Sequence, residues 1–529
     1  MSLNDLYRED FWPWDEDPTI HGNDAWTDDK IRRNFVGPIL AGTVNGEWAP
    51  VGDWWLNAYK AVSRANTILA NLEKAGGSVP EEMINRFAAE ARFVRASQYA
   101  MLIAHFGDVI YFTNVLDLEE AFTLGRSDKA TVLQAIYEDY DFAALHLPET
   151  YGSNELKRAT KGAALAMKAR IALYNEDWTV ASDAAKACMD LNIYQLYPDY
   201  GELFLSKTKN ANETVFGIAR SVTLGNFLPL SWTRNHLTRN AGGFAGPVPS
   251  WDLFCAYLCT DGLPIDESPL FDPQEPFQNR DPRCAETIVR FQTPHLGFIY
   301  QPHPDSVRVL NINSGNYQTN NDTRSVNQFA SYNGLVQKKG IDADWAGDNL
   351  TDPDKIIVRY ADVLLMYAEA NIELGQIDQT VLDAINTVRA RAYGVTKDDT
   401  ANYPEITTTD QTELRKQLWM ERRMEFAFEG LRYMDLIRWR LAEKALTRDI
   451  YGLLDVAELQ DKVVEPGLWF FPGTPEVDED GLPDFTALYN AGLIKLLALR
   501  DFNTDRQYLW PIPSSEILIN PNLEQNPGY

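Results

Sequence analysis

Two glutamates four residues apart are the first candidates for chemistry in the sequence. Glu421 and Glu425 stand in the string Glu421-Arg422-Arg423-Met424-Glu425, and a glycoside hydrolase uses two carboxyl groups as acid and as nucleophile or base. A general acid needs a raised pKa, whereas neighbouring arginines favour the ionised form of both side chains. Charges at this helical spacing among aromatic residues fit a buried ion-pair network better. Glycoside hydrolysis therefore stays an alternative function.

Other motifs for catalysis or metal binding are weak or missing. The strings GxSxG, HExxH, GxxxxGK and GxGxxG do not occur. Cys255 and Cys259 would share a face of a helix, but no further ligands complete a metal site, so we expect buried thiols. Asp478, Asp480 and Asp484 miss the spacing of a calcium loop and are expected to form a solvated acidic turn. We therefore expect no catalytic residue, no metal and no cofactor.

Aromatic side chains in irregular segments would suit sugar binding, the function that the family resemblance of this sequence implies. A pyranose ring packs its C–H faces on aromatic planes, and its hydroxyl groups need polar partners such as Asn, Asp and Arg. Of the 14 Trp residues, six fall in the first 55 positions, at 12, 14, 26, 48, 54 and 55. A packed core does not require this skew. The predicted glycan-binding residues are Trp54, Asn57, Trp48, Arg33, Trp26, Phe244, Trp251, Tyr332 and Trp345.

Trp54 is the first choice among these residues. Trp54 and Asn57 are one helical turn apart and would point the same way, and Trp48 and Arg33 come next. On this hypothesis Trp54→Ala weakens glycan affinity and leaves the melting temperature nearly unchanged. The alternative is that Trp54 and the adjacent Trp55 pack in the core at the end of the first helical hairpin, and the substitution then causes a large loss of stability.

Helical periodicity occurs in two blocks that must position these residues. Small residues at three- and four-residue spacing in 160–174 and 178–187 resemble a tetratricopeptide helix pair. The intervening region is rich in Gly, Pro, Asn and Asp and predicts loops and short strands, with one helix near 251–258. We predict one discontinuous domain over 1–529, with an N-terminal loop arm at 1–53, helical blocks at 54–190 and 351–446, an irregular insertion at 191–350 and a loop-rich region at 447–529.

The charge balance excludes two classes of partner. The chain has 76 Asp and Glu against 48 Lys and Arg, which gives a formal charge of −28. Nucleic acid demands a basic face, and so does an anionic membrane surface. No apolar run approaches the roughly 18 residues of a membrane helix.

Short strings along the chain match one protein family. They are Trp55-x3-Tyr59, Arg64-Ala65-Asn66, Glu90-Ala91-Arg92-Phe93-Val94-Arg95-Ala96, Phe106-Gly107-Asp108-Val109, Arg158-Ala159-Thr160-Lys161-Gly162, Asn279-Arg280-Asp281-Pro282-Arg283, Arg359-Tyr360-Ala361-Asp362-Val363-Leu364-Leu365-Met366-Tyr367-Ala368-Glu369-Ala370, Gly430-Leu431-Arg432-Tyr433, Leu509-Trp510-Pro511-Ile512-Pro513 and Gln525-Asn526-Pro527-Gly528-Tyr529. In this order they resemble the SusD/RagB nutrient-binding lipoproteins of Bacteroidetes.

The resemblance implies a mainly α, SusD-like fold, in which four tetratricopeptide-type helix pairs carry a loop-rich subdomain with short strands. It also implies a non-catalytic cell-surface protein that binds an oligosaccharide or polysaccharide and delivers it to a SusC-like TonB-dependent transporter. A lid subunit that binds peptide or another nutrient is a further alternative.

Ligand sites of this family lie in the loop before the first helix and in the loops of the irregular subdomain. Members are anchored in the outer membrane through a signal peptide and an N-terminal lipobox cysteine, whereas the first cysteine of this sequence is Cys188. We expect that Met1-Ser2-Leu3 replaces the leader and the lipidated cysteine.

Overall fold

The computed structural model shows a mainly helical protein with a few small sheets, as the sequence predicts. Trp14 lies outside the residues that the structure describes. The described residues are 2–13, 23–33, 35–74, 79–152, 157–341, 343–347 and 350–529.

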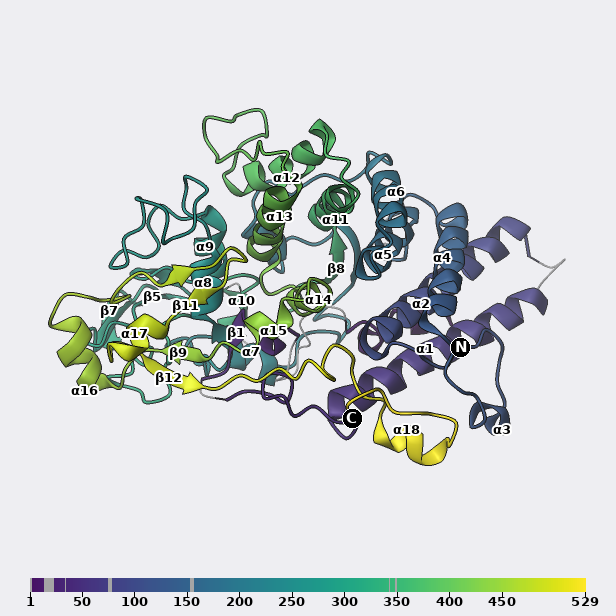
Figure 1. The fold of residues 1–529 in the computed structure, drawn as a ribbon, viewed down its shortest axis with the longest axis horizontal. Helices are drawn as coiled ribbons and strands as arrows, with labels where there is room; N and C mark the ends of the chain where they lie inside the picture. The colour runs from purple at the N-terminus through teal and green to yellow at the C-terminus, as the bar shows by residue number, and fades with distance from the viewer. Residues whose placement is uncertain are drawn as a thin grey trace.

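Long helices lie side by side in one array, which occupies the right and upper part of Figure 1. Each helix packs against the next member of the array in chain order, as consecutive helix pairs do. The array consists of α1 (Ala49–Lys74), α2 (Glu81–Phe106), α4 (Lys129–His146), α5 (Lys161–Tyr174), α6 (Trp178–Met189), α11 (Tyr360–Glu373), α12 (Gln379–Ala392) and α13 (Gln411–Phe426).

Local sequence signals explain how two of these helices begin and pack. The Thr160 hydroxyl accepts a hydrogen bond from the backbone N–H of Ala163 at the start of α5, and the Asp177 carboxylate caps α6 in the same way. Gly162 allows close packing, because a Cβ there would lie 2.2 Å from Tyr194 Oη. The small residues noted in the sequence therefore serve a close approach to α5.

Two predicted helix boundaries need correction, and one predicted break is confirmed. α1 begins at Ala49 rather than at residue 54, because Pro50 is tolerated in a first turn. The helical stretch 412–445, predicted with an interruption at Gly430, is broken after α13, where Phe428 and Gly430 have φ of 64° and 73°. The helix predicted near 251–258 ends at Ala256, so Cys255 and Cys259 do not share a helix face, although both are buried as expected.

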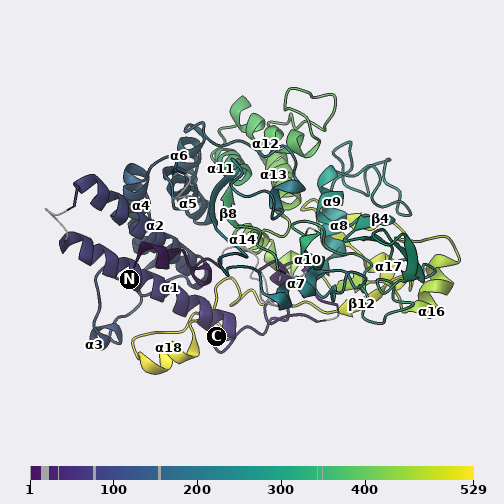
Figure 2. The same ribbon diagram turned by 180° about the vertical axis from the view of Figure 1, so that it is seen from behind.

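Small sheets tie distant segments together. Most of them lie in the loop-rich part of the molecule, opposite the array in Figures 1 and 2, whereas the pair of β2 and β8 lies against α5 and α11. β1 (Lys30–Ile31) pairs antiparallel with β3 (Val248–Pro249), and β2 (Thr214–Ile218) pairs with β8 (Lys355–Arg359). A four-stranded antiparallel sheet has the order β4 (Thr293–His295), β5 (Phe298–Tyr300), β6 (Arg308–Asn311) and β7 (Asn316–Thr319). Two further pairs are β9 (Ile450–Gly452) with β12 (Lys495–Ala498), and β10 (Glu476–Val477) with β11 (Pro483–Asp484).

Short helical turns complete the described chain. They are η1 (Leu3–Tyr7), η2 (Glu9–Phe11), η3 (Asn23–Trp26), α3 (Leu118–Ala121), η4 (Glu202–Phe204), α7 (Leu230–His236), α8 (Trp251–Ala256), α9 (Pro282–Thr287), α10 (Asp344–Gly347), α14 (Arg432–Arg438), α15 (Ala442–Ala445), α16 (Val456–Leu459), η5 (Gln460–Val464), α17 (Thr486–Asn490) and α18 (Ser514–Ile519).

A buried ion-pair network connects the array with the loop-rich part. Arg359, at the end of β8, donates to Glu213 (2.7 Å) and to Glu425 of α13 (2.6 Å). Arg359 also donates to Glu429 (2.7 Å). Arg391 of α12 contacts both Glu213 and Glu425. One cluster of charges therefore fixes β8, α12 and α13 against the segment that precedes β2.

The two glutamates considered as a catalytic pair belong to this network. Arg283 donates to Glu421 (2.6 Å) and Glu425 (2.9 Å), and Arg389 donates to Glu421 (2.8 Å). Burial would raise the pKa of Glu425, but the neighbouring arginines, Arg391 foremost, hold this pKa well below its usual range. The predicted structural network is confirmed, and neither carboxylate is exposed.

Three tryptophans near the N-terminus, Trp26, Trp48 and Trp54, form an aromatic cluster with Trp510. The ring of Trp26 lies 5.5 Å from Trp48, 5.7 Å from Trp54 and 5.4 Å from Trp510, between centroids. Trp54 also packs on His105 (4.8 Å), whose pKa is lowered to about 4 by burial. Trp26 and Trp54 are only 3% and 5% exposed, so the prediction that they present rings to a sugar is wrong. Their neighbours come from segments too distant in sequence for composition to reveal.

Trp54→Ala should lower the free energy of unfolding by about 3–5 kcal/mol, because it leaves a large cavity in this cluster. The matched control is Leu56→Ala on the same helix, where the side chain is 47% exposed and a surface substitution changes stability by about 0.5 kcal/mol or less. Urea denaturation measures both. If both substitutions changed the free energy of unfolding by the same small amount, Trp54 would have to be an exposed residue.

Glu425→Gln should lower the free energy of unfolding by about 3–5 kcal/mol, because it removes one buried negative charge that Arg359, Arg391 and Arg283 share and leaves the network with an excess of buried positive charge. Glu479→Gln is the control, since it removes an exposed partner of Lys416 and should leave the urea midpoint unchanged. A Glu425→Gln protein as stable as the wild type would disprove the structural role of the network.

Candidate functional site

Three irregular segments meet at one surface of the loop-rich part. They are the residues after β1, the loop 237–247 between α7 and β3, and the loop 320–334 after β7. The pairing of β1 with β3 brings the first two together, and Arg33 Nη2 donates to the carbonyl oxygen of Phe244 (3.4 Å). β1 and α7 accordingly lie next to each other near the middle of the molecule (Figure 1).

Backbone hydrogen bonds hold the loop 237–247 in place. The N–H of Ala245 donates to the carbonyl oxygen of Leu237 (2.9 Å), so the loop folds back on the end of α7. Gly243 permits this turn, because a Cβ would lie 2.2 Å from that same carbonyl oxygen. The buried carboxylate of Asp322 accepts from the backbone N–H of Arg239 (2.7 Å) and links this loop to the loop 320–334.

Guanidinium groups and exposed rings alternate on this surface. The guanidinium carbon of Arg33 lies 5.2 Å from the ring centroid of Phe329, and that of Arg239 lies 5.6 Å from it. Arg234 lies 4.9 Å from the ring of Phe244. Phe244 is 41% and Phe329 is 47% exposed. We name these five residues the arginine–phenylalanine surface; its rings can pack on the C–H face of a sugar, and its N–H groups can donate to oxygen atoms.

Tyr332 lies at the border of the arginine–phenylalanine surface. Its half-buried ring packs under the guanidinium group of Arg324 (4.5 Å), and its hydroxyl group raises the pKa of Arg239. Of the residues predicted from the sequence, Arg33, Phe244 and Tyr332 are thus brought together. Arg234, Arg239 and Phe329 were missed, since nothing in the sequence shows that their loops converge.

The other predicted residues lie elsewhere. Trp48 is half-buried in the aromatic cluster, and Asn57 is half-buried on α1. Because Trp54 is buried, Trp54 and Asn57 do not form an exposed pair. Trp251 is 1% exposed and donates from Nε1 to the carbonyl oxygen of Asn333 (2.9 Å), so its prediction as an exposed sugar platform is also wrong.

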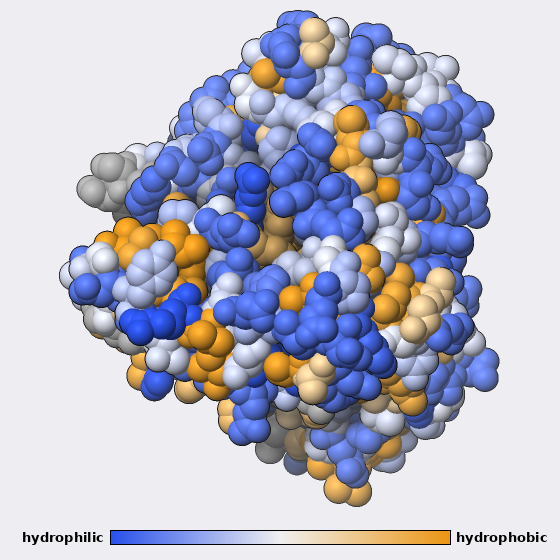
Figure 3. All heavy atoms as spheres, turned by 90° about the vertical axis from the view of Figure 1, so that its left-hand side faces the viewer, coloured by the Kyte–Doolittle hydropathy of each residue, from blue (hydrophilic) through white to orange (hydrophobic). Residues whose placement is uncertain are grey.

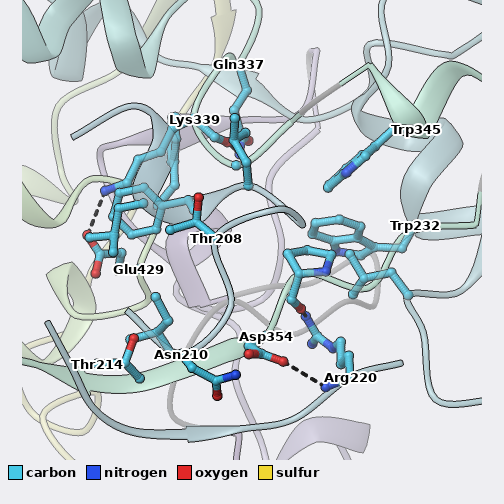
Figure 4. A pocket seen from close by; sticks show the side chains of 18 residues that line it. Thr208, Asn210, Thr214, Arg220, Trp232, Gln337, Lys339, Trp345, Asp354 and Glu429 are labelled. Atoms are coloured by element: carbon cyan, nitrogen blue, oxygen red, sulfur yellow. Dashed lines mark hydrogen bonds and ion pairs between the residues drawn. The ribbon is translucent and has the colours of Figure 1, made fainter. Parts of the chain in front are cut away.

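Trp345 lines a small cavity of about 120 Å³ that is partly open to solvent. In Figure 4, Trp345 and Trp232 lie on one side of this cavity, and the ion pair of Lys339 with Glu429 (2.6 Å) lies on the other. Trp345 is 1% exposed, and ligand pockets usually measure about 300–1,000 Å³. The cavity is too small for an oligosaccharide, so Trp345 is not a surface platform as predicted.

A larger cleft of about 530 Å³ lies between β4 and the segment after η5. Its walls combine the half-buried rings of Phe291 and Trp469 with Gln292 and Gln301. Figure 3 looks onto this end of the molecule, where a mainly hydrophilic surface is hollowed near its middle. Trp469 was not among the predicted residues, although an aromatic run between Gly467 and Pro472 marks it in the sequence.

A third hollow is apolar. The groove of about 470 Å³ between α1, α3 and α18 is lined by exposed Leu56, Val115, Phe122 and Ile519. Such walls offer few partners for hydroxyl groups.

The described part of the chain shows no cluster of metal-ligating side chains. Its His, Cys, Asp and Glu side chains form no group that could hold a metal ion. Asp478 and Asp480 pair with Lys444 rather than standing free in solvent, as a solvated turn would have them. None of the described helices is long and apolar enough to span a membrane.

Comparison with known proteins agrees with this architecture. A family model described as the SusD family matches residues 211–529, and a model described as starch-binding associating with outer membrane matches residues 35–173. SusD-like protein P2 of Formosa agariphila is 26% identical, over 94% of this chain and 84% of the relative. A SusD-like carbohydrate-binding protein of Bacteroides fragilis is 29% identical, with a TM-score of 0.81 over 99% of this chain and 98% of the other.

A laminarin-binding SusD-like protein has the same fold, at 20% identity and a TM-score of 0.66 over 100% of this chain and 98% of the other. The array and the loops it carries thus define a helical scaffold protein with a loop-built surface. The chain belongs to the SusD family, which confirms the family and the fold class predicted from the sequence.

Asp322→Asn should remove one pH dependence of stability. Burial raises the pKa of Asp322 to about 6, from an ordinary value of about 3.9. Between these values the folded protein keeps a proton that the unfolded chain releases, so the free energy of unfolding falls as the pH rises from about 4 to about 6, by on the order of 3 kcal/mol. Urea unfolding of both proteins over this range gives the difference. A constant difference between the two would contradict the assignment.

Proposed function

We propose that this protein captures an oligosaccharide or polysaccharide at the arginine–phenylalanine surface, without chemical conversion. The observation that carries the proposal is the pair of exposed rings, Phe244 and Phe329, on loops whose backbones are fixed by hydrogen bonds. Fixed rings bind a sugar face without a large entropic cost of ordering. The carbohydrate-binding description of the Bacteroides fragilis relative supports this assignment.

We further propose that the captured glycan passes to a SusC-like TonB-dependent transporter. On this proposal the protein is a surface-exposed lipoprotein of the outer membrane, held by an N-terminal lipid anchor. Membership of the SusD family supports both statements, and the description of the second matching model as associating with outer membrane supports the location.

Glycoside hydrolysis is the weaker alternative. A retaining or inverting hydrolase needs two carboxyl groups that reach the substrate, whereas Glu421 and Glu425 are buried and paired with arginines. This alternative would be supported if the protein released reducing sugar from a glycan and a single Asp or Glu substitution abolished that release. A lid subunit that takes peptide instead would bind no glycan.

The double substitution Phe244→Ala and Phe329→Ala should weaken glycan binding on the order of tenfold or more, because each stacked ring contributes about 0.5–1.5 kcal/mol. Affinity gel electrophoresis against a broad panel of polysaccharides measures the effect, and the melting temperature should stay close to that of the wild type because both rings are exposed.

Two controls locate the site. Tyr317→Ala removes a 63% exposed ring on β7 and should not change binding. Trp469→Ala tests the cleft beside β4. Loss of binding with Trp469→Ala and normal binding with the double variant would place the glycan in that cleft and reject the arginine–phenylalanine surface. No binding to any glycan by the wild type would reject the proposed function.

A further inference from the structure

The arginines of the arginine–phenylalanine surface have no carboxylate partners. Within the described part of the chain, Arg33, Arg234 and Arg239 form no ion pair; they contact ring faces and backbone carbonyl oxygens instead. The buried guanidinium group of Arg359, by contrast, is compensated by Glu213 and Glu425. A chain of net charge −28 has therefore left three guanidinium groups uncompensated at one exposed place.

Two of these positive charges, on Arg33 and Arg239, lie over the same ring of Phe329. Burial lowers the pKa of Arg239, and the charge of Arg33 lowers it further. The pKa of Arg32, the next residue along the chain, is lowered by burial and again by Arg33. Like charges that reduce each other's pKa repel, and a negative charge placed between them would relieve this repulsion.

The acidic groups nearby supply only part of that charge, because Asp322 raises the pKa of Arg239 by less than Arg33 lowers it. Asp322 turns its carboxylate toward the backbone N–H groups of Arg239 and Asn240. Asp455 is paired with Arg324 (3.1 Å) and with Lys495 (2.6 Å) at the border of the surface. The guanidinium groups over Phe244 and Phe329 thus keep N–H donors for a ligand.

We infer that the saccharide bound at this surface is anionic and carries carboxylate or sulfate groups. The inference rests on the proposed function and adds the substrate class to it. A guanidinium group donates paired N–H bonds to a carboxylate or sulfate, and such charge-assisted bonds are about twice as strong as neutral ones. The rings of Phe244 and Phe329 would take the apolar sugar face beside them.

Isothermal titration with oligosaccharides of equal length tests this inference. We expect uronate-containing or sulfated chains to bind at least tenfold more tightly than neutral chains. The difference in affinity between the uronate and sulfated series shows whether the surface prefers a carboxylate or a sulfate group. Raising the salt from about 0.1 M to about 1 M, which shortens the Debye length from about 10 Å to about 3 Å, should remove most of this preference.

The outcomes separate the two proposals. Neutral chains that bind as tightly as anionic ones would overturn the inference and leave the proposed function standing. Failure of every chain to bind would reject the proposed function and the inference together. Tighter binding of anionic chains that high salt does not weaken would contradict the role given to the guanidinium groups.

Substitution of Arg33 gives an independent test. Arg33→Gln should weaken the binding of anionic chains about fivefold to tenfold and leave neutral chains unaffected, whereas Arg33→Lys should retain part of the preference because it keeps the charge and loses the planar fork. Arg308→Gln is the matched control, an exposed arginine on β6 outside this surface. Equal losses of affinity for neutral and anionic chains with Arg33→Gln would overturn the inference. If this variant does not fold, the salt series on the wild type tests the inference instead.

Discussion

The placement of the loop-rich half depends on a few buried contacts around Arg359. This side chain stands where β8 runs into α11, and its carboxylate partners come from α13, from the residue before β2 and from Glu429. Lys339 joins the same group through Glu429, and burial lowers the pKa of Lys339 to about 8. Each buried charge needs an opposite charge at a short, fixed distance, whereas apolar side chains can pack in many arrangements. The network therefore determines how the irregular segments sit on the helices.

With this foundation, irregular loops can present residues as precisely as helices do. The segments after β1, before β3 and after β7 carry little secondary structure of their own, yet short strand pairs and side-chain bonds such as that of Asp322 fix them. Function in such a molecule lies on the loops and rigidity lies beneath them. An acidic chain thereby maintains a small basic surface, since local compensation rather than net charge decides the potential that a ligand meets.

Sequence reasoning succeeded where local patterns carry the information. The two helical blocks follow from periodicity within single elements such as α2 and α11, and they were predicted correctly. The burial of the α13 glutamates in an ion-pair network was also predicted, although their partners, such as Arg359 and Arg391, lie on other elements. Sequence reasoning failed for Trp26 and Trp54, because their partners Tyr433 and Trp510 come from remote segments. Residues Arg234 and Phe329 were missed for the same reason: an isolated Arg or Phe in a loop has no signature until the loops meet.

The aromatic cluster has a consequence for how the chain is made. Trp26 and Trp54 precede Trp510, whose backbone N–H donates to the carbonyl oxygen of His105, by more than 450 residues. During synthesis on the ribosome, α1 and α2 can form and pair early, but their aromatic side chains lack this partner until residue 510 has emerged. The first helix pair is therefore completed only after the last helix of the array, α13, has been synthesised.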